Sequence, residues 1–225
     1  MRTIVYIDGF NLYKAILTKT AHKWLDIHEL FARHVIRPIR PESEVTLTKF
    51  FTARILGRYA KDATSPHRQH AYLIALEKYH PGIVEIIEGK HFPVESEGRY
   101  IGPEIAGVTI QRARISRLEE KQTDVNIALN MYRDCAKGLC EQVVLVTNDS
   151  DLQPALSMIK EDFPSIVRGL VFPTLERKSA ALEEVASWTR HGLHAGELAK
   201  CQLPKRIPYQ SSRKTKHVVK PAEWE

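Results

Sequence analysis

The sequence predicts an α/β fold with a mainly parallel central sheet wrapped by helices. Three observations support this prediction. Apolar runs such as residues 2–8 and 143–147 end abruptly in acidic or turn residues, they are apolar at nearly every position, and helical patterns separate them. Strands that are buried on both faces of a parallel sheet show such continuous runs. With 225 residues, of which 43% are hydrophobic, the chain is long enough to bury the core of one domain.

The first half of the chain opens as strand, turn and helix. Residues 2–8 are β-branched and aromatic up to Asp-Gly, and residues 9–18 carry an apolar stripe at helical spacing. The elements expected next are a helix from Asp26 to His34, a strand from Val45 to Ile55, a helix from Ser65 to Tyr79 and a short strand from Ile83 to Ile87. Pro66 favours the start of the second of these helices.

The second half repeats the alternation after an irregular stretch. Residues 88–107 are rich in glycine and proline and predict a long loop or a small ribbon. The elements expected after it are a strand from Val108 to Ile115, a helix from Asp124 to Lys137, a strand from Val143 to Thr147, a helix from Leu152 to Ile159, a strand from Ile166 to Phe172 and a helix from Leu175 to Trp188.

The end of the chain is predicted to be a basic tail. From residue 198 onward there are seven lysines and arginines against two glutamates, which accounts for five of the six net positive charges. We therefore expect a globular domain over residues 1–190 and a flexible tail over residues 191–225. Such a tail can hold a polyanion by counterion release or can simply keep the protein in solution, and the two interpretations have equal weight.

Location and redox state follow from what the sequence lacks. The first residues, MRTIVYIDGF, do not have the pattern of a secretory signal, and no apolar run is long enough to cross a bilayer, so a cytoplasmic protein without membrane contact is expected. Three cysteines without a CxxC spacing suggest neither disulfides nor a zinc site. Cys135 and Cys140 are expected to be buried as small apolar side chains.

Acidic residues follow two of the predicted strands. Asp8 ends the first strand, and Asp149 and Asp151 follow the strand that ends at Thr147. Ligands of parallel α/β sheets bind outside the carboxyl ends of the strands. If the two strands are neighbours, the carboxylates meet, and their repulsion predicts raised pKa values or a bound cation. Oxygen ligands of this kind suit Mg²⁺ or Mn²⁺.

Each acid also has a purely structural interpretation. Asp124 begins a predicted helix, where Thr123 or Asp124 can serve as the N-cap, and capping is the commoner role. Asn-Asp-Ser-Asp before a helix is ordinary capping chemistry for Asp149 and Asp151 as well. Asp8, which directly follows an apolar strand, has the weakest structural explanation.

Three blocks of the sequence resemble the signature blocks of the NYN domain, a branch of the PIN-like nucleases. The blocks are Tyr6–Tyr13 (YIDGFNLY), Glu119–Ala128 (EEKQTDVNIA) and Val146–Leu152 (VTNDSDL), and the likeness extends over about residues 2–175. The resemblance implies a Rossmann-like, three-layer PIN/NYN fold and a Mg²⁺ or Mn²⁺ site that cleaves phosphodiesters, usually in RNA.

The resemblance also implies a role for each matched residue. Asp8, Asp124 and Asp149 would ligate the metal directly or through water. Asp151 would complete the site or orient a water, and Asn11 would position a phosphate or a metal-bound water. These five residues are the predicted catalytic set of a metal-dependent ribonuclease.

Contacts to nucleic acid are predicted with less specificity. The residues that could hold an RNA backbone are Lys90, Arg112, Arg114 and Lys121, although for each of them a solvated surface charge is the commoner role. Tyr13 and Trp24 could stack bases, but their helical spacing favours the core. PIN-like relatives often pair, so a homodimer is an open alternative to a monomer.

Two other functions compete with the nuclease. Chains with this opening and this Glu-Glu-Lys-Gln-Thr-Asp block are sometimes labelled NADH-dependent hydroxylases of 6-hydroxy-3-succinoylpyridine. No Gly-x-Gly-x-x-Gly follows a predicted strand, which counts against a dinucleotide site. The third candidate is a non-catalytic RNA-binding module, in which the acids are structural and the basic tail binds.

Overall fold

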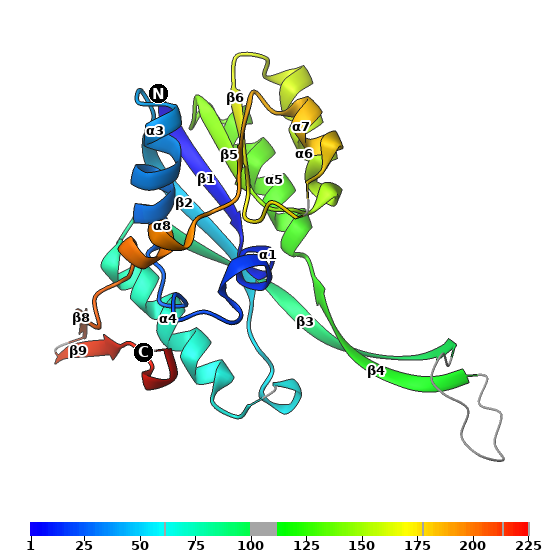
Figure 1. The fold of residues 1–225 in the computed structure, drawn as a ribbon, viewed down its shortest axis with the longest axis vertical. Coiled ribbons are helices and arrows are strands. Elements are labelled where there is room, and N and C mark those ends of the chain that lie inside the picture. The colour runs from blue at the N-terminus through cyan, green and yellow to red at the C-terminus, as the bar shows by residue number, and fades with distance from the viewer. Residues whose placement is uncertain (61, 100–111, 177, 213, 225) are drawn as a thin grey trace.

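A single sheet organises the molecule. The computed structural model describes residues 1–60, 62–99, 112–176, 178–212 and 214–224. Over these ranges seven strands form one sheet in the order β4-β3-β2-β1-β5-β6-β7, and β8 and β9 form a separate hairpin (Figure 1). The strands of the sheet are β1 (Arg2–Asp8), β2 (Glu44–Ala53), β3 (Val84–Arg99), β4 (Arg112–Lys121), β5 (Gln142–Val146), β6 (Val167–Phe172) and β7 (Trp188–His191).

The sheet is parallel from β3 to β7, as predicted. β1 lies at its centre and pairs in parallel with β2 on one side and with β5 on the other. The Ile7↔Val146 pairing aligns the carboxyl ends of β1 and β5. The chain moves from β1 outward in one direction and returns to build the other half from β5, so the strand order reverses between these two strands. Over the described ranges, the antiparallel strand β4 pairs with β3 alone.

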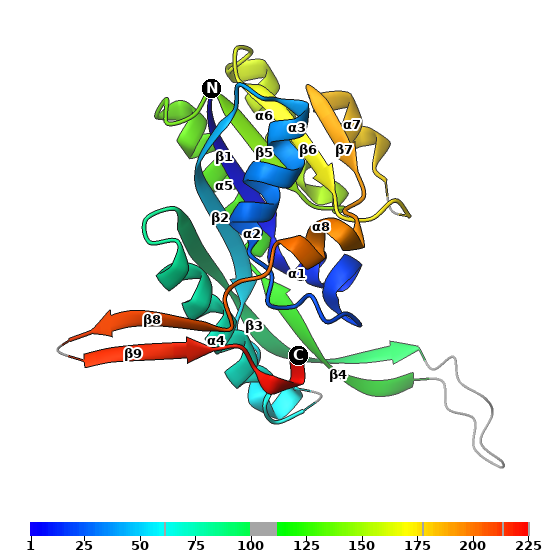
Figure 2. The same cartoon turned by 60° about the vertical axis from the view of Figure 1, so that its left-hand side comes forward.

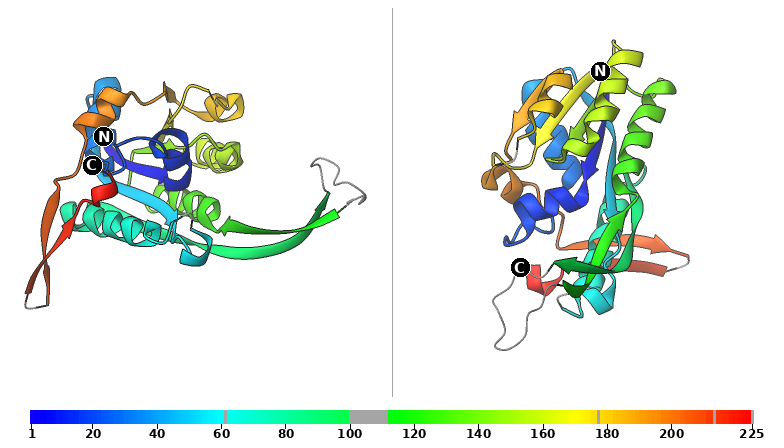
Figure 3. Two further views of the ribbon diagram at one scale, coloured as in Figure 1. Left: turned by 60° about the horizontal axis from the view of Figure 1, so that its bottom comes forward. Right: turned by 90° about the vertical axis from the view of Figure 1, so that its right-hand side faces the viewer.

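Helices cover both faces of the sheet (Figure 3). One face carries short helical segments and two longer ones: α1 (Gly9–Leu12), the π-helical η1 (Tyr13–Leu17), α2 (Ile27–Glu29), the π-helical η2 (Leu30–Ile36), α3 (Arg37–Ile39), α4 (Ser65–Tyr79) and α8 (Ala195–Lys200). The other face carries α5 (Thr123–Ala136), α6 (Gln153–Asp162) and α7 (Ala180–Val185). Short 3₁₀ turns are η3 (Gly57–Tyr59), η4 (Ser150–Leu152) and η5 (Ala222–Trp224).

The alternation of side chains along β1 feeds two cores. Val5 and Ile7 belong to the cluster beneath η2, α4 and α8, whereas Ile4 and Tyr6 belong to the cluster beneath α5, α6 and α7. This arrangement explains why the run from Ile4 to Ile7 is apolar at every position, since successive side chains of a strand point to opposite faces. The predicted three-layer α/β fold is confirmed. No helix among the described residues is both long and apolar enough to span a bilayer.

The long irregular stretch is a ribbon. β3 continues from Val84 to Arg99 and pairs antiparallel with β4, so a two-stranded arm projects from the domain (Figures 1 and 2). Of the two alternatives for residues 88–107, the ribbon is correct for the described part. The strand predicted from Val108 lies partly outside the described residues, and the observed strand runs from Arg112 to Lys121. Because the arm carries charged residues on an exposed surface, it lacks the apolar periodicity that marks the other strands.

The helix predicted from Leu175 to Trp188 is wrong in its extent. Of the described residues in this span, only Ala180–Val185 is helical, and Ser179 caps it by accepting a hydrogen bond from the Leu182 N–H. Trp188 begins β7, where its indole packs against Gly169 of β6 and donates a hydrogen bond to Gln142 Oε1. The apolar residues that suggested one helix are divided between a short helix and an edge strand.

The end of the chain differs from the predicted flexible tail. Residues 195–200 form α8, and β8 (Arg206–Ser211) pairs with β9 (Lys214–Val219). Leu198, Leu203 and Ile207 are buried in the same cluster as β1 side chains. The prediction of a tail relied on the many basic residues and overlooked these apolar residues, which are widely spaced in the sequence. Each of them packs into the core of the domain.

A buried ion pair connects the sheet to α5. Lys49 Nζ lies 2.6 Å from Asp134 Oδ2, and the Tyr6 hydroxyl donates to the same oxygen at 2.8 Å. Both charged side chains are buried. In this position the desolvated charges compensate each other, and removal of one leaves the other without its partner.

We predict that Lys49→Met lowers the free energy of unfolding by about 3 to 5 kcal/mol because it leaves Asp134 buried without its cation. Adding Asp134→Asn should recover much of this loss, since an amide can still accept from Tyr6. Urea denaturation of the single and double variants measures both effects. Arg133→Met is the control: its exposed guanidinium is 3.8 Å from the other Asp134 oxygen, and its loss should cost less than about 1 kcal/mol. Equal losses for Lys49→Met and Arg133→Met would contradict the prediction.

Candidate functional site

A cavity opens where the strand order reverses. It has a volume of about 680 Å³ and lies beyond the carboxyl ends of β1 and β5. Open α/β sheets bind ligands at this position because the loops after the two strands diverge there. The polar side chains that line it include Asp8, Asn11, Lys14, Glu120, Asp124, Asn148 and Asp149. We call it the acid pocket.

Asp8 is the buried acid of this pocket. It ends β1 and caps α1: its Oδ1 accepts the Asn11 N–H at 2.9 Å, and its Oδ2 accepts the Thr147 hydroxyl at 3.0 Å. Burial raises the pKa of Asp8 to about 6, against the lowering effect of these hydrogen bonds, and the carboxylates of Asp124 and Glu120 raise it further. Asp8 therefore has a structural role as a cap, which the sequence did not suggest, as well as an unfavourable charge.

Asn11 and Thr147 join the turns after β1 and β5. Asn11 Oδ1 accepts the N–H of Asn148 at 3.0 Å, and Thr147 Oγ1 accepts the N–H of Asp149 at 3.0 Å. Since the Thr147 hydroxyl also donates to Asp8, it connects two of the predicted ligands. The side-chain amide oxygen of Asn11 thus positions the backbone at Asn148. The resemblance had implied a contact of Asn11 with phosphate or a metal-bound water.

Asp124 comes from a third element. β4 ends at Lys121, Gln122 adopts a left-handed conformation with a φ of 78°, and α5 begins at Thr123. The N-cap position is therefore Gln122, so Asp124 is not the capping residue. Partial burial raises the pKa of Asp124, and the carboxylates of Asp149, Glu120 and Asp151 raise it further. The capping interpretation of Asp124 is wrong.

Asp149 and Asp151 lie at the turn after β5. Asp149 caps the 3₁₀ turn η4, where its Oδ1 accepts the Asp151 N–H at 3.0 Å, so the capping interpretation holds for this residue. It also lines the acid pocket. Asp151 is exposed, does not line the cavity and acts on it through its charge, which contributes to the raised pKa of Asp124.

The carboxylates are near one another but are not arranged as a preformed metal cage. Among the described residues, no three His, Cys, Asp or Glu side chains are placed to ligate one ion together. The donor set nevertheless has the chemistry of a hard-cation site, because it consists of carboxylate and amide oxygens. Burial, and after it the repulsion between the carboxylates, raises the pKa values of Asp8 and Asp124.

The predicted phosphate-binding residues lie on the β3–β4 ribbon and not in the pocket. Lys90 and Lys121 face each other across the ribbon, next to β4's end. Arg112 and Arg114 lie further out, where they form exposed ion pairs with Glu97 and Glu95. Arg112 and Arg114 are close to Asp124 in the sequence. They lie away from the acids in space because the ribbon is extended.

Other predictions about single residues have mixed outcomes. Trp24 is buried in the core, as expected, whereas Tyr13 is exposed. Cys135 and Cys140 are buried free cysteines, as expected, and Cys201 is also free.

Three residues that the sequence did not single out contribute to the pocket. Thr147 holds the two turns together, and its hydroxyl, directly after the apolar residues of β5, was the available signal. Glu120 lines the cavity and accepts a hydrogen bond from the Thr123 hydroxyl. It belongs to the EEKQTD block, but a string of charged residues does not show which of them points inward. Lys14 is a cation that lines the cavity.

Comparison with known proteins finds similarity to a curated sequence relative and to a solved structure. The 6-hydroxy-3-succinoylpyridine 3-monooxygenase HspA of Pseudomonas putida is 36% identical over the whole of this chain, and the match covers 75% of that protein. A crystal structure of a protein of unknown function from Vibrio parahaemolyticus superposes with a TM-score of 0.48 and 14% identity, over 86% of this chain and 93% of that one. No protein-family model matches the sequence.

The buried charge of Asp8 predicts a pH dependence of stability. Its pKa in the folded protein is about 6, above the ordinary value of 3.8. Between these values the folded state binds more protons than the unfolded chain, so this group's contribution to stability is present at low pH and is lost as the pH rises through about 6. We expect Asp8→Asn to raise the free energy of unfolding by about 2 kcal/mol at pH ~8 without divalent cations, and the gain to vanish below pH ~4.

Urea denaturation across this pH range measures the gain. Glu161→Gln, at an exposed acid on α6, is the matched control, and its effect should stay within about 0.5 kcal/mol throughout. A destabilising Asp8→Asn at high pH would mean that the capping and Thr147 hydrogen bonds outweigh the burial of the charge.

Proposed function

The chain belongs to the family of the Pseudomonas putida 6-hydroxy-3-succinoylpyridine 3-monooxygenase HspA, and we propose that it is an enzyme whose catalytic centre is the acid pocket. The reaction that this geometry supports best is the hydrolysis of phosphodiester bonds, in RNA, with Mg²⁺ or Mn²⁺. One observation carries this proposal. Asp8, Asp124 and Asp149, from three separate elements, line one cavity at the point where the strand order reverses.

The residues of the pocket fit a divalent cation. Asp8, Asp124 and Asp149 would hold it. Burial, and after it the neighbouring carboxylates, raise the pKa values of Asp8 and Asp124, and a cation would offset this unfavourable negative charge. When bound, such an ion supplies Lewis acidity and lowers the pKa of a water molecule, which are the demands of phosphodiester hydrolysis.

The chain's own residues then have distinct tasks. Thr147 and Asn11 fix the turns after β1 and β5, so Asp8 and Asp149 keep their positions relative to each other. Lys14, at the wall of the pocket, can bind a phosphate oxygen on the side facing α1. Asp151 lies outside the cavity and adds negative charge around Asp124. None of these tasks requires a protein nucleophile.

RNA is the proposed substrate because of the NYN-like blocks. The nearest basic residues of the predicted set are Lys90 and Lys121, where the ribbon joins the sheet. A non-catalytic RNA-binding module would have the same basic residues, so only cleavage separates an enzyme from such a module.

A second candidate is hydroxylation of a pyridine, and the named relative favours it. HspA is called a 6-hydroxy-3-succinoylpyridine 3-monooxygenase, and its identity to this chain extends over the full length given. On this proposal the substrate is a small aromatic acid, dioxygen supplies the inserted oxygen atom, and NADH supplies the two electrons that reduce the other oxygen atom to water.

The first strand-to-helix turn does not fit the pyrophosphate of NADH. In dinucleotide-binding folds the first helix offers free backbone N–H groups to the phosphates. Here the Asp8 carboxylate occupies the end of α1 and would repel a phosphate. Gly9 is required for packing, because a Cβ at this position would lie 2.6 Å from the Phe51 carbonyl oxygen. The turn after β1 therefore does not suit the pyrophosphate of NADH.

Paired assays on one preparation test the proposal. Wild-type protein and Asp149→Asn are incubated with labelled single-stranded RNA in Mn²⁺ or EDTA, and NADH oxidation is followed with 6-hydroxy-3-succinoylpyridine. We expect cleavage in Mn²⁺ only, reduced at least ~100-fold in Asp149→Asn because a cation ligand is lost. Glu161→Gln should cleave as the wild type does.

The metal is tested separately from turnover. Mn²⁺ should raise the melting temperature of the wild type but not that of Asp149→Asn, since a ligand that binds only the folded state stabilises it. Substrate-dependent loss of NADH without RNA cleavage would reject the hydrolase in favour of the hydroxylase. Binding of RNA without either reaction would leave a non-catalytic module.

A further inference from the structure

A second cavity lies next to the acid pocket. It has a volume of about 540 Å³ and lies beyond the carboxyl end of β2, between η1 and α4. Phe10, Lys14 and Glu120 line both cavities, so the two share a wall. A molecule with its reacting group among the acids could therefore extend into this second cavity, which we call the aromatic cavity.

The aromatic cavity collects exposed rings. Phe10 is 51% exposed, Tyr13 is 40% exposed and Tyr59 is 37% exposed, and all three line it. They come from separate segments, α1, η1 and η3. Exposed rings gathered around one cavity are a usual sign of a ligand site, because each offers a face on which a planar ring can stack.

The shape of the cavity is fixed by hydrogen bonds behind its walls. Gln69 of α4 donates to the Ala53 carbonyl at 2.9 Å and accepts the Ile55 N–H at 2.9 Å, which holds the loop after β2 in place. The Tyr72 hydroxyl donates to the Leu25 carbonyl at 2.7 Å. The cavity is thus built by the native fold and does not depend on closure around a ligand.

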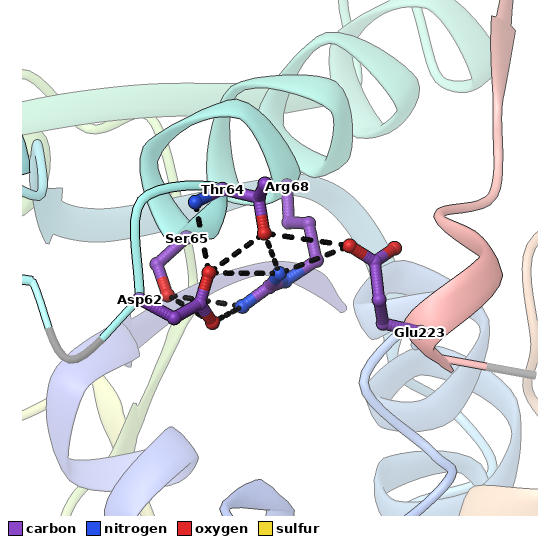
Figure 4. Close-up of polar contacts among 5 residues, drawn as sticks. All are labelled: Asp62, Thr64, Ser65, Arg68 and Glu223. Atoms are coloured by element: carbon purple, nitrogen blue, oxygen red, sulfur yellow. Dashed lines mark hydrogen bonds and ion pairs between the residues drawn. The ribbon is translucent and has the colours of Figure 1, made fainter.

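The C-terminal turn completes one wall. Trp224 lines the cavity and packs against Trp24 and Tyr72, with ring centroids 6.2 and 6.1 Å apart. Its neighbour Glu223 forms an ion pair with Arg68 (Figure 4).

Lysines of the cavity lining offer contacts to an anion. Arg68 also pairs with Asp62, so its two carboxylate partners more than neutralise it and it offers no free positive charge (Figure 4). The remaining lysines and acids of the lining are Lys14 and Lys23 against Glu120. Lys14 Nζ lies 5.3 Å from the centre of the Phe10 ring, which places a cation beside a stacking surface.

We propose that the aromatic cavity binds a planar heteroaromatic ring that carries an anionic group, and presents its substituent to the acid pocket. The proposal rests on the proposed function only in taking the acid pocket as the reactive centre. Two sources share this chemistry: a nucleotide, whose base would stack on the tyrosines, and a small pyridine acid.

Binding is tested without turnover. Uridine 5′-monophosphate and pyridine-3-carboxylate are titrated by calorimetry into the protein in EDTA, for the wild type, Tyr59→Ala, Tyr13→Ala and Asp149→Asn. We expect at least one probe to bind, and to bind at least about five-fold more weakly to either tyrosine variant, since each loses a stacking face. Tyr79→Ala is the matched control: Tyr79 is 43% exposed but lies outside the cavity, and its variant should bind as the wild type does.

The outcomes separate this inference from the proposed function. Binding that Asp149→Asn retains and Tyr59→Ala weakens supports the cavity even if no RNA is cleaved. The probe that binds more tightly identifies the nucleotide or the pyridine acid as the source. Absence of binding of both probes at millimolar concentration, or equal binding by Tyr59→Ala and Tyr79→Ala, would overturn the inference.

Discussion

The candidate site depends on the parallel pairing of β1 with β5 at the centre of the sheet. This pairing sets Ile7 opposite Val146, so Asp8 and Thr147 follow at the same level. One hydroxyl then reaches both turns, because Thr147 donates to Asp8 and accepts from the Asp149 N–H. A shift of the register by one residue would reverse the faces of the strand and separate the two acids. The apolar strands that fill both cores thus also determine the positions of the polar residues that follow them.

That constraint explains how much could be predicted. Continuous apolar runs identify buried parallel strands, and acids that follow such strands must meet if the strands are adjacent, so the sequence predicted Asp8 and Asp149 together. Asp124 comes from a helix that follows the ribbon, and its role as a cap or a site residue depended on where α5 begins. Only the structure shows that Gln122 takes the cap position and leaves the Asp124 carboxylate to the pocket.

Other features were hidden for physical reasons. The β3–β4 ribbon has charged residues on an exposed surface and so lacks an apolar period, and its arginines pair with glutamates of the opposite strand. The C-terminal segment appeared to be a tail because its basic residues are many and its anchors few. Leu198, Leu203 and Ile207 are nevertheless buried in the main core. Isolated apolar residues in a charged segment do not form a helical or strand periodicity that could be recognised in the sequence.

The two chemistries considered for this family make different demands on the same turn. A dinucleotide needs free N–H groups and no negative charge at the first helix, whereas a divalent cation needs the negative charge that Asp8 supplies. The turn after β1 meets the second demand and not the first. The aromatic cavity is compatible with both substrates, because a nucleobase and a pyridine stack alike. The carboxylates of the acid pocket therefore determine which type of reaction is possible. The rings of the adjoining aromatic cavity determine which substrate can bind.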